Sequence, residues 1–243
     1  MVDNFELIKE YMADQLLDWK EGDCYYVQLL RRQADDPKIN GVPDPKYHGN
    51  MHSRSIKDYF IKSIEHLDDV KEDIIALCKM FNVRAYIRLN KRNYQKLALS
   101  MMKQICDQMY SGQTFSSPFH MVASAAGQSS AAGKGKTWIV DMDKEYLPFE
   151  QEVKDMICEC EPHASNIKWY EDSPLKRSHE EAVKIYQNRE FFTVPTKNGK
   201  HFIVKPFNMQ TFSEKWKEFA EKNASGMKMM DVHKDNPTIL YVP

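Results

Sequence analysis

The sequence has few cysteines, almost no net charge and no long apolar run. Its five cysteines are an odd number scattered along the chain, which argues against the disulfide framework of a secreted protein. Its 34 basic and 35 acidic side chains nearly cancel, so any affinity for nucleic acid must come from local patches. No apolar stretch approaches the roughly 20 residues that cross a membrane, and the N-terminus lacks the pattern of a signal peptide. We therefore expect a cytoplasmic protein with no membrane contact.

The residues that are present indicate a folded chain. Hydrophobic residues make up 42% of the sequence and aromatic residues 12%, which is typical of a globular protein and excludes a disordered one. A chain of 243 residues can bury a sizeable core, either as one large domain or as two small ones.

The first half of the sequence alternates between helical and strand periodicity. Ser55 and Asp58 have the spacing of a helix-start capping box, so we expect a helix to begin at Ser55. Residues 112–137 are rich in Ser, Ala and Gly without periodicity, which predicts a mobile loop. The other expected elements are a helix over residues 4–20, a strand over 24–30, a loop over 35–50, a helix that follows Asp68-Asp69, a strand over 83–89 and a helix over 93–110.

The second half predicts strands separated by single helices and by one hairpin. Asn198-Gly199 is a strong hairpin signal, and a hairpin makes an antiparallel pair of strands. A mixed α+β sheet is therefore expected in place of a doubly wound parallel one. Further capping boxes are read at Ser178 and Thr211. The expected elements are strands over residues 138–143, 166–170, 191–195, 201–206 and 238–242, and helices over about 148–160 and 178–188.

Two aspartates at the end of an apolar strand are the strongest candidate for chemistry. The strand is Trp138-Ile-Val-Asp-Met-Asp143, and alternation along a strand places Asp141 and Asp143 on the same face. Two carboxylates on one face can share one or two hard divalent cations, which is a way to build a site for phosphate chemistry. The alternative for this pair is structural, because such aspartates also cap the turn or helix that follows a strand.

A later turn and strand carry basic groups that fit the same chemistry. The turn Thr196-Lys-Asn-Gly-Lys-His201 opens an apolar strand, and Lys205 follows that strand. His201, Lys200 and Lys205 could hold a triphosphate, since positioning and charge stabilisation are the protein's main tasks in phosphoryl transfer. The alternative for His201 is a partly buried histidine that only makes a hydrogen bond.

These motifs resemble the archaeo-eukaryotic primase superfamily, also called primase-polymerases. The resemblance depends on three segments: Ile139-Val-Asp-Met-Asp143, Asn198-Gly-Lys-His201 with the following strand, and Met229-Met-Asp231 before the closing strand. The resemblance covers roughly residues 80–243. It implies an RRM-like mixed or antiparallel catalytic sheet with flanking helices, preceded by an N-terminal helical or αβ module over residues 1–79; a single integrated domain is the alternative.

The resemblance also implies roles for single residues. Asp141, Asp143 and Asp231 would be the catalytic carboxylates that hold Mg²⁺ or Mn²⁺, with Asp235 competing for the place of Asp231. His201 would contact the phosphates of the incoming nucleoside triphosphate. The chain would join nucleotides on single-stranded or primed DNA during replication of a phage, plasmid or mobile element, with a replicative helicase as a candidate partner.

A template path is suggested by a run of basic residues without an acidic one. Arg84, Tyr86 and Arg88 alternate onto one strand face, a mixture suited to phosphate contacts and base stacking. The further candidates of this path are Lys91 and Arg92. The run also includes Lys96 and Lys103, for which a solvated basic face is the alternative.

Two other functions fit parts of the sequence. The pair Asp141 and Asp143 is similar to the first motif of haloacid dehalogenase-like phosphatases, although Lys144-Glu145 stands where that family has Gly-Thr or a similar pair. An inactive RRM-like module that binds single-stranded nucleic acid is the non-enzyme alternative. Zinc is not expected, because Cys158, Cys160 and His163 provide three ligands where a zinc site takes four at wider spacing.

Overall fold

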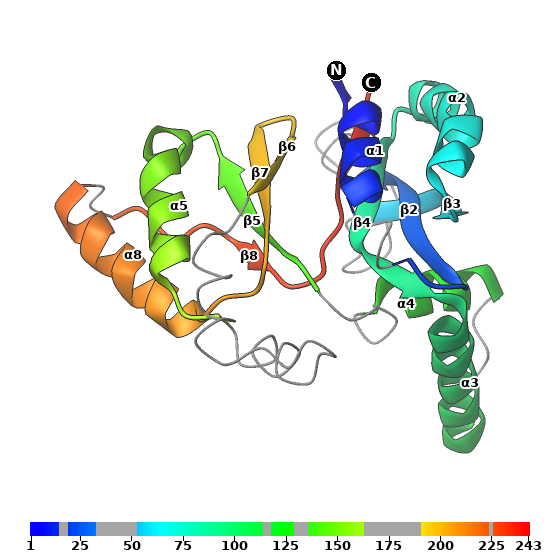
Figure 1. The fold of residues 1–243 in the computed structure, drawn as a ribbon. Helices are drawn as coiled ribbons and strands as arrows, with labels where there is room; N and C mark the ends of the chain where they lie inside the picture. Colours follow the sequence, from blue (N-terminus) through cyan, green and yellow to red (C-terminus); the bar gives the residue numbers. More distant parts are fainter. Residues whose placement is uncertain (15–18, 33–52, 114–117, 129–135, 163–190, 224–225) are drawn as a thin grey trace, which may run out of the picture. The chain divides into compact units, whose positions relative to one another are not determined.

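Two antiparallel sheets organise the chain (Figure 1). The computed structural model describes residues 1–14, 19–32, 53–113, 118–128, 136–162, 191–223 and 226–243. The first compact unit comprises Met1–Lys134 together with Pro237–Pro243, and the second comprises Gly135–Asn236. Each unit combines one sheet with helices, so the protein is of the α+β class. The division differs from the boundary expected near residue 80, because the strand and helix that follow residue 80 join the first unit.

The first unit contains a five-stranded sheet in the order β1-β9-β4-β2-β3. The terminal strand β9 pairs with both β1 and β4, so the two ends of the chain are neighbours in one sheet. Its strands are β1 (Val2–Asp3), β2 (Asp23–Arg32), β3 (Ser53–Ile61), β4 (Arg84–Asn93) and β9 (Thr238–Val242). Its helices are α1 (Phe5–Asp14), α2 (Ile64–Phe81), α3 (Tyr94–Ser111) and α4 (Pro118–Gly127).

The expected helix at Ser55 is wrong, because this segment forms strand β3. Tyr59 and Ile61 are buried and pair with β2 across the sheet, and the Ser55 hydroxyl donates to Asp58 within the strand instead of capping a helix. Helix α2 begins later, where the side chain of Ser63 accepts a hydrogen bond from the backbone N–H of His66. The pairing with β2 therefore outweighs a local capping signal.

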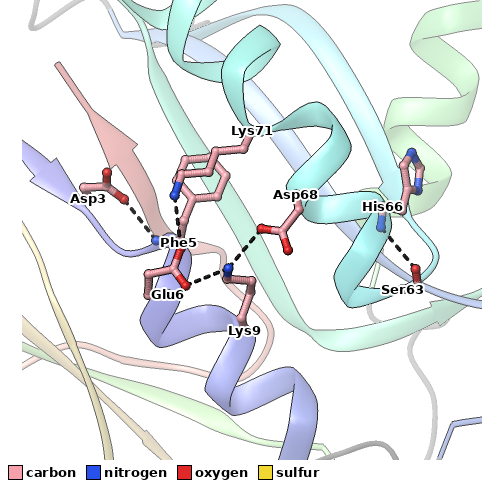
Figure 2. A network of polar contacts seen from close by, with 8 residues as sticks. All are labelled: Asp3, Phe5, Glu6, Lys9, Ser63, His66, Asp68 and Lys71. Atoms are coloured by element: carbon pink, nitrogen blue, oxygen red, sulfur yellow. Dashed lines mark hydrogen bonds and ion pairs between the residues drawn. The ribbon is translucent and has the colours of Figure 1, made fainter.

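Charged side chains join α1 to α2 (Figure 2). The ammonium of Lys9 lies 2.6 Å from a carboxylate oxygen of Glu6 and 2.9 Å from one of Asp68. Lys71 of α2 reaches the other carboxylate oxygen of Glu6 at 3.0 Å. These surface ion pairs contribute little stability each. The apolar residues beneath them provide the main contribution, because Phe5 and Ile8 of α1 are fully buried.

The second unit contains a four-stranded sheet in the order β6-β7-β5-β8. Helices α5 and α8 contribute Val153 and Trp216 to the same apolar core as Val140 and Phe202 of the sheet. The strands are β5 (Trp138–Asp143), β6 (Phe192–Pro195), β7 (Gly199–Val204) and β8 (Val232–His233). The helices are the 3-10 turn η4 (Leu147–Phe149), α5 (Glu150–Glu159) and α8 (Met209–Asn223).

Two further expectations differ from the structure. Part of the expected loop over residues 112–137 is helix α4, whose Ala125 and Ala126 pack against Tyr26 and Leu97. Helix α8 is capped by Asn208, whose side-chain oxygen accepts from the backbone of Gln210 and Thr211, so the expected cap at Thr211 is wrong.

Several expected elements lie outside the described residues. These are the loop over residues 35–50, the strand over 166–170 and the helix over 178–188 with its cap at Ser178. Within the described residues, no helix has both the length and the apolar character needed to cross a membrane.

Candidate functional site

Strand β5 presents its two aspartates on the face opposite the helices. Val140 and Met142 are fully buried in the core with α5 and α8. Alternation along the strand turns Asp141 and Asp143 to the other face, as the sequence predicts. The side chain of Asp141 keeps 30% of its surface exposed, and Asp143 is exposed. Both carboxylates can therefore be reached by a ligand.

His201 lies directly across from Asp141 on the neighbouring strand β7. The two residues are Cα partners in the antiparallel register, so their side chains share a face. Nε2 of His201 is 3.4 Å from Oδ1 of Asp141, and the His201 side chain is 13% exposed. The imidazole and the carboxylate are therefore within ion-pair distance of each other on one face of the sheet.

Asp231 approaches Asp141 from the other side of β5. The backbone N–H of Asp141 donates to the carbonyl of Asp231 over 2.9 Å. The register that pairs Ile139 with His233 and Val140 with Val232 continues to place Asp231 opposite Asp141. Asp231 is exposed and lies at the entrance to β8, whereas Asp235 follows the strand. The structure thus brings Asp231, and not Asp235, beside the aspartate pair.

The carboxylates of this face act on one another electrostatically. Partial desolvation raises the pKa of Asp143, and the charges of Asp141, Glu145 and Asp231 raise it further, against an opposing effect of His201. Burial, a hydrogen bond to Glu145 and the nearby charges of Asp231 and Asp143 raise the pKa of Tyr146 to about 12. The strand end is therefore a region of negative potential.

Gly199 allows the hairpin to approach β5 closely at the site. It is the Cα partner of Asp143, and a Cβ atom at this position would overlap the carbonyl oxygen of Met142. No side chain fits there without moving the backbone. The glycine of the expected Asn198-Gly199 hairpin therefore lets β7 approach the backbone of β5 at Met142 and Asp143.

The two candidate lysines lie apart from the aspartates. Lys200 pairs with Met142, on the helix-facing side, and its ammonium contacts Glu150 at 2.5 Å. Hydrogen bonds from Lys154 and Lys200 lower the pKa of Glu150, so these three residues form a link between α5 and β7. Lys205 is exposed beyond the far end of β7, about 13 Å from His201 along the strand at ~3.3 Å per residue.

No ready metal cage exists in the part of the chain that the structure describes. There, no three His, Cys, Asp or Glu side chains converge closely enough to hold a metal ion. Neither Cys158 nor Cys160 forms a disulfide, and the Cys160 thiol donates to the carbonyl of Met156. His163, their proposed partner, lies outside the described residues.

The residues of the expected template path belong to the first unit. Arg84, Tyr86 and Arg88 share one face of β4, but Tyr86 is only 8% exposed and packs against Ile239. A buried ring of this kind is not available for base stacking. The half-buried Arg88 lies beside the end of α4, since its guanidinium is 3.8 Å from the Cβ position of Gly127.

Lys91 and Arg92 have structural contacts. The ammonium of Lys91 lies 3.8 Å from Asp23 and over the ring of Trp19. Arg92 is fully buried, and its guanidinium donates to the carbonyls of Ala126 and Asn90. A buried guanidinium that binds carbonyls offers no surface to a phosphate, so we leave Arg92 out of the proposed path.

The sequence reasoning missed the contribution of Glu145. Its carboxylate acts on both Asp143 and Tyr146. An acidic residue two positions after an Asp-x-Asp pair, in the turn that leaves the strand, was the available signal. The backbone N–H of Tyr146 donates to the carbonyl of Asp143 over 2.9 Å and closes this turn.

Comparisons with known proteins identify no relative of this chain. No model of a protein family, no curated protein and no solved structure matches this chain at a significant level.

Proposed function

We propose that the protein is a metal-dependent nucleotidyltransferase of the primase-polymerase type. The observation that carries the proposal is the arrangement around Asp141, which has His201 on the neighbouring strand β7 and Asp231 immediately before the other neighbour, β8. Asp143 adds a carboxylate two residues along the same face. Motifs that are far apart in the sequence, and that were selected for their chemistry, thus meet on adjacent strands.

The topology of the second unit supports the proposal. In the described residues of this unit, which leave out 163–190, the strands occur along the chain as β5, β6, β7 and β8, with α5 after the first and α8 after the third. The spatial order β8-β5-β7-β6 with every neighbouring pair antiparallel corresponds to the βαββαβ arrangement of RRM-like and ferredoxin-like sheets. One of the two central strands of this sheet, β5, carries the aspartates.

The donor set fits a hard divalent cation such as Mg²⁺ or Mn²⁺. Asp141, Asp143 and Asp231 offer carboxylate oxygens. Desolvation raises the pKa of Asp143 and the neighbouring carboxylate charges raise it further, and a bound cation relieves repulsion of that second kind. When bound, such cations supply charge neutralisation at the phosphates and activation of the attacking hydroxyl. The three side chains would have to turn toward one another, since they do not yet converge.

His201 would hold the phosphates of the nucleoside triphosphate. Its position opposite Asp141 places an orientable N–H donor at the edge of the carboxylate face. Lys200 is committed to Glu150 and is not assigned this role, whereas the exposed Lys205 could meet a more distant part of the substrate. Single-stranded or primed DNA, a replicative helicase and a mobile-element context remain predictions.

The two alternatives are unequally supported. A phosphatase of the haloacid dehalogenase type needs its first aspartate on a parallel sheet, whereas β5 lies between the antiparallel neighbours β7 and β8. An inactive RRM-like module that binds single-stranded nucleic acid would keep the same sheet. Such a module differs from the proposed nucleotidyltransferase only in that it would not incorporate nucleotides.

The test is incorporation of a labelled nucleotide on primed and unprimed single-stranded DNA with Mg²⁺ or Mn²⁺. Asp141→Asn combined with Asp143→Asn should lower the rate by about 100-fold or more, because the cations that these carboxylates would hold contribute several kcal/mol. The matched control combines Asp14→Asn with Asp69→Asn, two exposed aspartates of the first unit, and should keep the wild-type rate. Undiminished metal-dependent product from the variant that lacks both site carboxylates, or no product from the wild type, would contradict the proposal.

A further inference from the structure

Four arginines gather where three neighbouring strands of the first unit have their ends. Strand β2 ends with Arg31 and Arg32, β3 begins beside them with Arg54 as its second residue, and β4 begins with Arg84. The strands are adjacent in the order β4-β2-β3. Only Arg84 of this set belongs to the template path predicted from the sequence, since the other three are separated from it by a long stretch of sequence.

Two of these arginines face each other directly. Arg31 and Arg54 are Cα partners in the antiparallel register, so their side chains lie on the same face of the sheet. Like charges in this position destabilise a pair of strands. Arg54 is exposed, and Arg31 is half-buried.

The other two arginines lie on the opposite face of the same sheet end. Arg84 is the partner of Leu30, and Arg32 lies two residues further along β2, so both side chains project from one face. The guanidinium of the exposed Arg32 donates to the hydroxyl of Tyr86 over 3.4 Å, which draws it across β4. The role of Tyr86 is therefore to position Arg32 and not to stack on a base.

The surroundings strengthen the positive charge. The segments 29–32, 53–57 and 84–88 contain six basic residues and no acidic residue. Lys57 is engaged with Asp73 of α2, and Arg88 lies beside α4. The four arginines at the strand ends therefore make a local basic patch on a chain whose total charge is only −1.

We propose that Arg31, Arg32, Arg54 and Arg84 bind the phosphate backbone of single-stranded nucleic acid. The guanidinium group matches phosphate oxygens with two parallel hydrogen bonds. On each face the two arginines come from neighbouring strands ~4.8 Å apart, so they fit successive phosphates of a chain better than one isolated phosphate. The inference deepens the proposed function by naming where the strand binds, but the binding itself needs no metal.

The experiment measures binding of a fluorescein-labelled single-stranded oligonucleotide by anisotropy, in EDTA, at several salt concentrations. Arg31→Gln with Arg54→Gln, and Arg32→Gln with Arg84→Gln, should each weaken binding. Each pair should also lower the slope of log Kd against log salt by about 1.4, because each phosphate contact of a single strand contributes about 0.7. The charge-matched control is Lys217→Gln with Lys222→Gln, two exposed lysines of α8.

The single variant Arg54→Glu keeps the test decisive if a double variant is unstable, because Arg54 is exposed. It should weaken binding more than Arg54→Gln does. An unchanged slope in these variants, or an equal loss in the lysine control, would overturn the inference, as would a wild-type protein without affinity. Equal competition by inorganic polyphosphate would assign the patch to phosphate chains in general and overturn the assignment to nucleic acid.

The outcome is separable from that of the proposed function. Arginine-dependent binding without nucleotide incorporation would contradict the proposed nucleotidyltransferase and support binding of nucleic acid by the arginines. The opposite result is loss of incorporation in the variant of Asp141 and Asp143, with a slope of log Kd against log salt that the arginine variants do not change. That result would support the nucleotidyltransferase and contradict binding by the arginines.

Discussion

At the scale of single residues, the candidate site depends on which side of a strand each group occupies. Asp141 and His201 share a face because they are partners in adjacent strands, whereas Lys200, the preceding residue, projects to the helices and contacts Glu150. A displacement of one residue in the register would exchange these two faces. Side chains along β7 alternate between the two faces of the sheet, so a residue's position in this alternation decides whether it faces the site or the helices.

The raised pKa of Asp143 makes a prediction about stability and pH. A carboxyl group that binds its proton more tightly in the folded state destabilises the fold once it ionises, so its contribution becomes less favourable above the ordinary aspartate pKa of about 3.9. Relative to the wild type, Asp143→Asn should therefore gain free energy of unfolding as the pH rises from 3 to 7. Urea unfolding in EDTA at pH 3, 5 and 7 measures this difference.

For Glu150→Gln, the change in stability with pH relative to the wild type should have the opposite sign to that for Asp143→Asn. Hydrogen bonds from Lys154 and Lys200 lower the pKa of Glu150, so the ionised wild-type side chain stabilises the fold above the ordinary glutamate pKa of about 4.3. This variant should lose stability relative to the wild type over the same rise in pH. Differences of the same sign for both variants would contradict the electrostatic description of the site.

At the scale of elements, long-range pairing decides where α2 begins. Two serines compete as possible helix caps: Ser55, which lies in strand β3, and Ser63, which caps α2. The cap at Ser63 is followed by a helix that ends with Asn82 in the left-handed conformation. Both ends of α2 thus have the local chemistry of a helix terminus, although the sequence pattern placed its start elsewhere.

The two serines give a matched test. Ser63→Ala should lower the free energy of unfolding by about 1 kcal/mol, because the backbone N–H of His66 loses its acceptor. Ser55→Ala should change it by less than about 0.5 kcal/mol, as for other exposed positions. Chemical denaturation of both variants measures the difference. A larger effect at Ser55 than at Ser63 would favour a helix that begins at Ser55.

At the scale of the whole molecule, the first unit depends on the last residues of the chain. Strand β9 lies between β1 and β4, and the backbone N–H of Asn4 donates to the carbonyl of Leu240 over 3.0 Å. The side-chain amide of Asn4 also donates to the carbonyl of Ile239. The second unit is therefore an insertion within the sequence of the first.

Leu240→Ala tests this dependence. Leu240 is fully buried, so removal of its side chain should lower the free energy of unfolding of the first unit by about 2–5 kcal/mol. The control Leu99→Ala lies on α3, where the side chain is 60% exposed, and should change stability by less than about 0.5 kcal/mol. Equal effects of the two changes, measured by denaturant unfolding, would show that β9 does not stabilise the unit.

The sequence alone determined the elements whose signals are local. Alternation placed Asp141 and Asp143 on one face, Asn198-Gly199 predicted the hairpin, and the helix over residues 93–110 ends at Gly112 as its pattern indicated. Periodicity and turn chemistry involve residues that are close along the chain, so they can be read directly.

Only the tertiary structure decided which distant residues meet. It made a strand of residues 53–61, placed Asp231 beside Asp141, buried Arg92 and brought Arg54 opposite Arg31. Each of these outcomes depends on sheet order and register, which follow from the burial of whole faces and not from local propensity. For this reason Asp141, Asp143, His201 and Asp231 could be named as candidates from the sequence, whereas their meeting on one face of a sheet, and the arginine patch, could not be derived from it.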